Sequence, residues 1–164
     1  MATQTTPAGY HTVTPYLIVD NAAKALEFYQ KALNAKEIYR LPTPGDKSGK
    51  KIAHAEIRIG DSQLMLSDEY PDMDALGPKS LGGTPASFLI YVDDVDKAFE
   101  QAVNAGGKAV QPVEDQFWGD RMGTLTDPFG HQWSLATHVE DVPEAEMQAR
   151  MEQFGTKQKE AEPA

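Results

Sequence analysis

The chain has 164 residues, of which 15 are Lys or Arg and 25 are Asp or Glu, so its formal net charge at pH 7 is −10. This negative charge repels nucleic-acid phosphates and anionic lipid, and we expect neither nucleic acid nor a membrane as a partner. The absence of cysteine excludes a disulfide framework, a thiolate metal site and a cysteine nucleophile. The start lacks the pattern of a leader, and no apolar run could span a bilayer, which predicts a cytoplasmic protein.

The first predicted elements are a strand and a helix. The β-rich run PYLIV predicts the strand, and apolar residues at helical spacing over 22–33 predict a helix of about three turns. Asp20 or Asn21 can cap its first amides, and Asn34 suits the left-handed residue that ends a helix. Strands are expected after it, so residues 12–68 form a predicted module of order β-α-β-β-β, preceded by an N-terminal extension over residues 1–11.

The same pattern returns in the second half of the chain. VDNAAKALE at 19–27 and VDDVDKAFE at 92–100 share Val, Asp, Lys, Ala and Glu at matching places. The run SFLIYV predicts the strand before the second helix, and further strands follow it, so residues 85–137 predict a second module. The Gly- and Pro-rich segment 69–84 is expected to be a loop that links the two. Two copies of a long period favour a pseudo-symmetric pair rather than a solenoid.

The sequence predicts a C-terminal helix within residues 139–164. Asp141 and Glu144 have the spacing of a capping box. Three apolar residues then share one helical face: Met147, Met151 and Phe154. We expect this helix to pack on the domain or on a second subunit, and residues 157–164 to form a disordered tail.

Alternation along the predicted strands separates their side chains into two faces. One set is apolar and is expected to pack against the helices: Leu17, Val19, Ala55, Ile57, Ile59, Leu64, Leu66, Phe88, Ile90, Val92, Trp133 and Leu135. The other set is mixed: Thr14, Tyr16, Ile18, His54, Glu56, Arg58, Gln63, Met65, Ser67, Ser87, Leu89, Tyr91, Gln132 and Ser134. We interpret the mixed set as the lining of a concave, partly polar cavity, with an ordinary solvated sheet face as the alternative.

Several segments resemble the vicinal oxygen chelate superfamily, which includes glyoxalase I, extradiol dioxygenases and bleomycin-resistance proteins. These are VDNAAKALEFYQKAL, VDDVDKAFEQAV, HAEIRIGDSQLMLSDE and above all DQFWGDRMGTLTDPFGHQWSLATH. The resemblance covers residues 12–138 and is greatest to the PhnB-like, glyoxalase/bleomycin-resistance branch. It implies an α+β fold of two pseudo-symmetric βαβββ modules that form a cupped mixed sheet, here followed by a C-terminal helix. It also implies a homodimer.

The resemblance further implies where a metal would bind. In metal-dependent members, four His or Glu ligands come from the first and last strands of each module. The matching positions here carry Thr14, Met65, Ser87 and Ser134. One thioether and three neutral hydroxyls are poor ligands for Ni²⁺, Zn²⁺ or Fe²⁺, so we expect no metal at these positions and no cofactor.

Histidines and carboxylates supply the remaining candidates for chemistry. His54 and Glu56 alternate with Arg58 on one predicted strand, where His54 or Glu56 could be a general base or begin a relocated metal site and Arg58 could hold an anion. The alternative, which we favour, is a charge cluster at the rim of the sheet. His131 lies in the predicted turn DPFGHQ and is expected to be structural. His11 and His138 flank the domain and are not expected to join a catalytic group.

The segment EDQFWGDR at 114–121 predicts a loop that brings aromatic side chains, Asp120 and Arg121 together. Aromatic faces beside an arginine suit a planar or anionic ligand, although the loop could instead plug the cavity or cover a dimer seam. We therefore predict ligand contacts from Tyr16, Met65, Tyr91, Phe117, Trp118, Arg121 and Ser134.

Two functions are compatible with the sequence. The first is a metal-free cavity that binds a small organic molecule. The alternative is a glyoxalase-like enzyme, of the lyase or oxygenase class, that acts on an oxygenated metabolite with His54 and Glu56 as acid and base or with a relocated metal. The sequence contains no GxSxG elbow, Walker A pattern or GxGxxG motif, which leaves acyl transfer, nucleotide hydrolysis and dinucleotide chemistry without support.

Overall fold

The computed structural model describes residues 5–161 and the side chains of residues 5–155. Its elements run in the order β1 (Tyr16–Val19), α1 (Ala22–Leu33), β2 (Lys36–Pro42), β3 (Ile52–Ile59), β4 (Ser62–Asp68), the 3₁₀ helix η1 (Pro71–Met73), α2 (Pro78–Leu81), β5 (Ser87–Tyr91), α3 (Val95–Asn104), β6 (Lys108–Asp115), β7 (Asp120–Thr126), β8 (Gln132–His138) and α4 (Glu144–Ala161). No helix among the described residues combines the length and the apolar character needed to cross a membrane.

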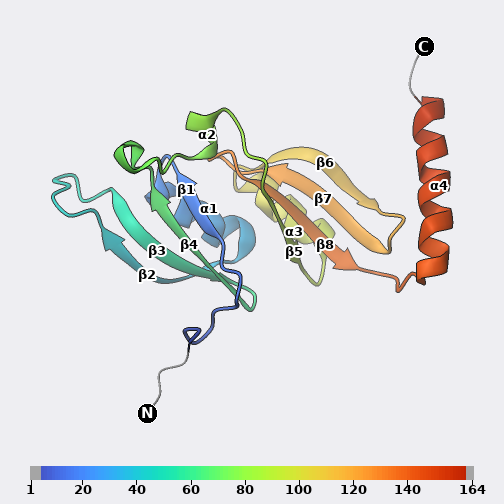
Figure 1. Ribbon diagram of the computed structural model, residues 1–164, viewed down its shortest axis with the longest axis horizontal. Helices are drawn as coiled ribbons and strands as arrows, with labels where there is room; N and C mark the ends of the chain where they lie inside the picture. Colours follow the sequence, from blue (N-terminus) through green and yellow to red (C-terminus); the bar gives the residue numbers. More distant parts are fainter. Residues whose placement is uncertain (1–4, 162–164) are drawn as a thin grey trace.

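The strands form two sheets with the same topology. Module 1 has the strand order β1-β4-β3-β2 and module 2 the order β5-β8-β7-β6. In each sheet the first strand pairs in parallel with the last, and the other neighbours are antiparallel. The predicted α+β class and paired βαβββ arrangement are confirmed, with one four-stranded sheet for each module. Figure 1 shows the two sheets side by side, with α1 and α3 behind them.

The repeat extends to the way in which each long helix begins. Asn21 accepts a hydrogen bond from the Lys24 amide at 3.0 Å, and Asp94 accepts one from the Lys97 amide at 3.1 Å, as N-caps do. A side chain at the end of the last strand binds the first helical amide of its own module: Asp68 Oδ1 accepts from Ala22 N at 2.9 Å, and Thr137 Oγ1 from Val95 N at 3.0 Å. Both helices are thereby fixed to their sheets.

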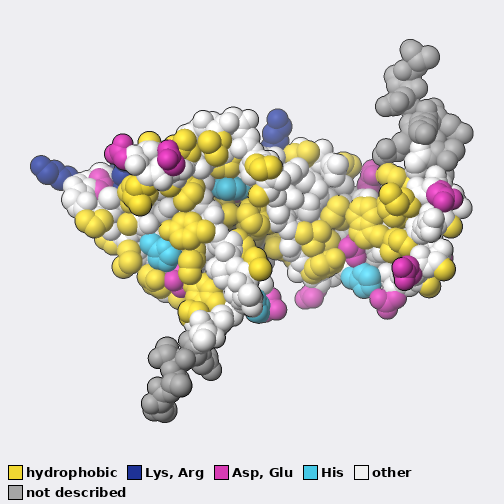
Figure 2. Space-filling model, in the orientation of Figure 1, with side chains coloured by type: hydrophobic (Ala, Val, Ile, Leu, Met, Phe, Trp, Pro, Cys, Tyr) yellow, Lys and Arg dark blue, Asp and Glu magenta, His cyan; other side chains and the backbone are white. Residues whose placement is uncertain are grey.

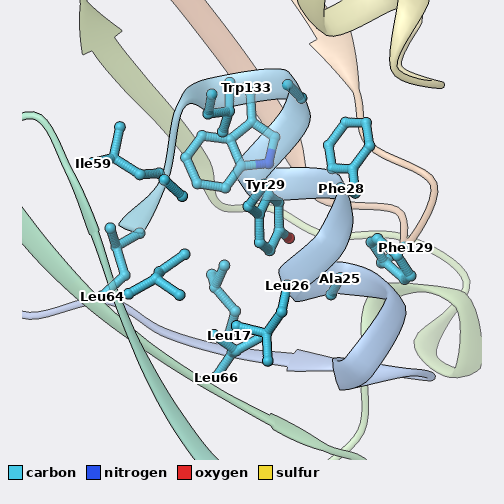
Figure 3. Packing of buried hydrophobic residues seen from close by; sticks show 14 of the residues in the cluster. Leu17, Ala25, Leu26, Phe28, Tyr29, Ile59, Leu64, Leu66, Phe129 and Trp133 are labelled. Atoms are coloured by element: carbon cyan, nitrogen blue, oxygen red, sulfur yellow. The ribbon is translucent and has the colours of Figure 1, made fainter. Parts of the chain in front are cut away.

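One hydrophobic core lies between the helices and the inner faces of both sheets. The apolar set expected to face the helices is buried or packs against this core. Tyr29 and Trp133 lie together in it, with ring centroids 5.5 Å apart (Figure 3). Both donate to Asp127 Oδ2, Tyr29 from its hydroxyl at 2.7 Å and Trp133 from Nε1 at 2.9 Å. Helix α1 of module 1 is thus joined to the β7–β8 turn of module 2.

Three local expectations are wrong. The linker is not all loop, because η1 and α2 lie within it, each with a proline in its first turn. Asp141 does not cap α4, which begins three residues later; its carboxylate instead contacts His138 at 2.9 Å. The expected tail is partly helical because α4 continues to residue 161, whereas residues 162–164 lie outside the described part of the chain.

Candidate functional site

Each sheet has an open face, defined here as the face opposite the helices. In module 1 the open face carries Tyr16, Ile18, Tyr39, Leu41, His54, Glu56, Arg58, Gln63, Met65 and Ser67. In module 2 it carries Ser87, Leu89, Tyr91, Asp120, Met122, Thr124, Gln132, Ser134 and His138. Apart from Thr14, which precedes β1, the mixed set identified in the sequence lies on these faces, where strand register places its members next to one another.

A hydrogen-bonded network occupies the open face of module 1. The Tyr16 hydroxyl and His54 Nδ1 are 3.0 Å apart, and His54 Nε2 is 3.3 Å from Glu56 Oε1. The Tyr39 hydroxyl donates to the same oxygen at 2.8 Å. Side chains from β2 and β3 thus contact one carboxylate, and Tyr16 of β1 is joined to it through His54. The two candidate acid–base residues are in direct contact.

Glu56 is only 9% exposed, yet its surroundings favour the charged form. Burial raises the pKa of Glu56, but hydrogen bonding from tyrosine hydroxyls and from His54 outweighs burial and leaves that pKa below its usual value. The same carboxylate raises the pKa of Tyr39. The network therefore holds an anion at the sheet surface, with phenolic and imidazole groups as its donors.

A second buried carboxylate lies on the open face of module 2. Asp120 is 4% exposed; its Oδ2 accepts from the Tyr91 hydroxyl at 3.0 Å and from Trp118 Nε1 at 3.1 Å. Its Oδ1 is 2.8 Å from His138 Nδ1. His138 lies at the end of the domain, and its sequence position does not predict membership of such a group. Only the pairing of β7 with β8, which aligns Asp120 with His138, brings it into the cluster.

The loop between β6 and β7 separates its predicted ligand residues. Trp118 joins the Asp120 cluster, whereas Phe117 packs against Phe154 of α4 with ring centroids 5.5 Å apart. Arg121 points to the helix side, where its guanidinium donates to Asp96 at 2.7 and 2.8 Å and to Asp115 at 3.0 Å. Both carboxylates raise its pKa. The structure therefore does not bring Arg121 together with Tyr91 or Tyr16.

The positions that match metal ligands in the resembled superfamily carry a donor set that does not fit such a metal. The Thr14 hydroxyl donates to the His11 carbonyl at 3.1 Å, and the Ser134 and Thr124 hydroxyls share a hydrogen bond of 2.9 Å. Met65 lies beside Tyr16 in the sheet, and Ser87 is exposed. Neutral hydroxyls and a thioether bind Zn²⁺, Ni²⁺ or Fe²⁺ poorly. Within residues 5–161 no group of three or more His, Asp or Glu side chains is arranged to hold a metal ion.

A mostly apolar hollow lies beside the Glu56 network. Its volume is about 380 Å³, and it is lined by Tyr16, Ile18, Ala53, Ser67, Tyr70, Met73 and Ala75. Tyr16 belongs to both the hollow and the network. A separate groove of about 520 Å³ lies on the helix side, between α1 and the β7–β8 turn. His131 is buried, and its Nε2 lies 2.9 Å from the Ile18 carbonyl oxygen, which gives it a structural position.

Large hydrophobic side chains are left uncovered on both open faces. Tyr16, Tyr39 and Leu41 in module 1 are 46%, 42% and 51% exposed, and Leu89 and Tyr91 in module 2 are 47% and 63% exposed. Figure 2, which views these faces, shows hydrophobic side chains gathered over both sheets and Lys and Arg only near the margins. Uncovered patches of this kind mark binding surfaces.

Comparisons with known proteins give a consistent result. A model of the Glyoxalase/Bleomycin resistance protein/Dioxygenase superfamily matches residues 9–135. The chain is similar to the uncharacterised protein Rv0887c of Mycobacterium tuberculosis, with 45% identity over 146 residues that cover 87% of this chain and 84% of the relative. Among solved structures it is similar to protein PA1353 from Pseudomonas aeruginosa, with a TM-score of 0.62, 29% identity, and coverage of 79% of this chain and 99% of that chain. It is also similar in fold to a PhnB protein from Bacillus cereus, with a TM-score of 0.60, 18% identity, and coverage of 77% and 99%.

Proposed function

We propose that this chain, which belongs to the Glyoxalase/Bleomycin resistance protein/Dioxygenase superfamily, binds a small organic molecule, without a metal, in a cavity that two copies of the chain complete. Its assignment to the PhnB-like branch stays a prediction, since the PhnB protein shares only 18% identity with the chain.

The observation that carries this proposal is the pair of uncovered open faces. Each face combines half-exposed aromatic and aliphatic side chains with one buried carboxylate, a composition that suits a ligand site better than a solvated sheet. A single chain places the two faces side by side rather than opposite one another (Figure 1). A second copy can cover both open faces. A twofold axis that places module 1 of one copy against module 2 of the other also places module 2 of the first copy against module 1 of the second.

The proposed lining takes residues from both modules. Tyr16, Met65 and His54 contribute from module 1, and Tyr91 and Ser134 from module 2, with Trp118 at the margin. Aromatic side chains supply contact area at low entropic cost, and the hydroxyls supply orientation. Ligand contacts from Phe117 and Arg121 stay predictions. Their packing against α4 and α3 makes them weaker candidates than Tyr91.

Native mass spectrometry of the purified protein tests the dimer and the ligand in one experiment. We expect a dimer, with a non-covalent organic ligand when the protein is taken directly from cells. Leu89→Glu, which places a charge on the open face of module 2, is expected to convert the dimer to monomer and to release the ligand. Leu81→Glu is the matched control, because Leu81 is 66% exposed on α2, away from both open faces. A monomeric wild-type chain, or a Leu89→Glu dimer that keeps its ligand, would refute the proposal.

The Tyr16–His54–Glu56 contacts favour a second candidate function, an enzyme that acts on an oxygenated metabolite. The imidazole bridges a phenol and a carboxylate, so His54 could pass a proton between a substrate near Tyr16 and Glu56. This candidate would be supported if the wild-type chain converts a captured ligand and His54→Ala does not, while the variant keeps the wild-type thermal unfolding midpoint. Stoichiometric binding with no conversion supports the first.

A further inference from the structure

We infer that the ligand is an organic amine: its positively charged nitrogen binds at Glu56, and its apolar body fills the adjacent hollow lined by Tyr16, Tyr70 and Met73. This inference rests on the proposed function, because it assigns the chemical class of the molecule bound at that site.

Glu56 carries a negative charge that no Lys or Arg of the described chain balances. Its contacts within the described chain come from Tyr39, from His54 and from the approach of Tyr10, and it forms no ion pair with Lys or Arg. Arg58, the next residue on the same strand face, is exposed and does not pair with it. Hydrogen bonds keep this 9% exposed carboxylate in its charged form, but no Lys or Arg of the described chain supplies the opposite charge. A ligand ammonium group would provide that charge.

Aromatic rings surround the Glu56 carboxylate. Tyr16 and Tyr39 lie on either side of His54, with ring centroids 5.6 and 5.8 Å from the imidazole. The buried Tyr10 hydroxyl also approaches Glu56, and no other polar group of the described chain contacts it. Tyrosine faces attract ammonium groups, and this attraction is stronger where water is displaced, as the adjacent hollow allows.

The apolar hollow lies next to the Glu56 network. Tyr16 connects the two parts of the site, because its hydroxyl contacts His54 while its side chain lines the hollow. The hollow of about 380 Å³ has few polar groups other than Ser67 and the tyrosine hydroxyls. A molecule with an aryl or alkyl body and a terminal amine matches an apolar hollow that lies beside an anionic group. An organic acid would instead place its negative charge next to that of Glu56, and the two would repel each other.

The surrounding surface points to the same ligand charge. Asp120, the buried carboxylate on the open face of module 2, also forms no ion pair with Lys or Arg among the described residues, because its partners are Tyr91, Trp118 and His138. In the view of the open faces, Lys and Arg lie only near the margins (Figure 2). The field over both faces therefore favours a cation.

Three probes of one shape and different charge test the inference: phenethylamine, phenethyl alcohol and phenylacetate, titrated into the full-length chain by isothermal titration calorimetry. We expect phenethylamine to bind ~10-fold more tightly than the alcohol, equivalent to about 1.4 kcal/mol, and phenylacetate to bind most weakly. In Glu56→Gln the advantage of the amine should disappear while the affinity of the alcohol stays unchanged. Glu100→Gln, at an exposed position on α3, is the matched control and should keep the wild-type order.

The outcomes separate this inference from the proposed function. Equal affinity for amine and alcohol, or an amine preference that survives Glu56→Gln, would overturn the inference. So would capture of a neutral or acidic ligand by the dimer in native mass spectrometry, a result that would leave the proposed function intact. If Glu56→Gln does not fold, the order of the three probes on the wild-type chain still decides.

Discussion

Asp120 and Asp127 are both buried and lie seven positions apart, yet they serve different parts of the molecule. Asp127 faces the core, where it accepts hydrogen bonds from Tyr29 and Trp133 and from the backbone amides of Phe129 and His131. Asp120 faces the open side and holds Tyr91, Trp118 and His138. The position of each aspartate in the β7–turn–β8 segment therefore determines whether it stabilises the core or lies at the open face.

His138 carries the clearest pH dependence at this scale. Asp141 and then Asp120 raise the pKa of His138 above its ordinary value of 6.5. Because the folded pKa is raised, the stabilisation from these contacts is fully present below pH 6.5 and is lost as pH rises through the folded pKa. We expect an NMR titration of the imidazole to give a value above 6.5, and Asp141→Ala to lower it.

Asp93→Ala, an exposed change before α3, is the control for that titration and should leave the His138 midpoint in place. A midpoint at or below the ordinary histidine value, or one that Asp141→Ala does not move, would contradict the assigned contacts.

Residue roles could be predicted from the sequence only where a local pattern carries them. The alternation of His54 and Glu56 is visible in one strand, and the structure places the two side chains in contact. The roles of His138 and Asp127 depend on partners in other strands or in α1. Arg121 shows the same limit: its register sends it toward Asp96, a contact that the loop sequence alone does not reveal.

At the scale of elements, the two long helices depend on side chains from distant strands. Asp68 is 7% exposed and accepts from both Ala22 N and Ile52 N, at 2.9 and 2.6 Å. Thr137 is its counterpart in module 2 and accepts from Val95 N. Each last strand therefore stabilises both its sheet and the start of its helix.

Asp68→Ala is expected to lower the free energy of unfolding by about 2–3 kcal/mol, because it leaves two buried amides without acceptors. Thr137→Val, which removes one such contact, should cost about 1 kcal/mol. Urea unfolding measures both, and hydrogen exchange should show faster exchange at the Ala22 amide in Asp68→Ala alone. Equal costs for the two variants would indicate that the amides find other acceptors.

The helices and strands could be largely predicted because their periods and N-caps are local signals. Asn21, one of the two residues predicted to cap α1, forms its N-cap, and Asn34 ends the helix as predicted. The predicted Asp141 capping box is wrong because the helix starts at Glu144 and the Asp141 carboxylate contacts His138. Helix α4 begins after Pro143 instead, and its early contacts come from Arg150, which pairs with Glu140.

At the scale of the whole molecule, the modules share one core rather than two. Phe28 and Tyr29 of α1 pack against Phe129 and Trp133 of module 2. Gln101 of α3 donates to the Lys31 carbonyl at 2.7 Å, so the two long helices are also joined directly. The pairing of modules could be predicted from the repeat. The separation of the two open faces could not, because it depends on how α1 and α3 pack.

A shared core predicts that both modules unfold together. In a Trp118→Phe background, Trp133 fluorescence reports on module 2, and hydrogen exchange of β3 peptides reports on module 1. At a fixed protein concentration we expect one urea midpoint for both reporters. Tyr29→Ala, which removes a fully buried ring at the junction, should lower that common midpoint and cost about 3–5 kcal/mol. Loss of the Trp133 signal at a lower urea concentration than β3 protection would instead mean that each module is stable by itself, and that the aromatic junction merely holds two independent units in place.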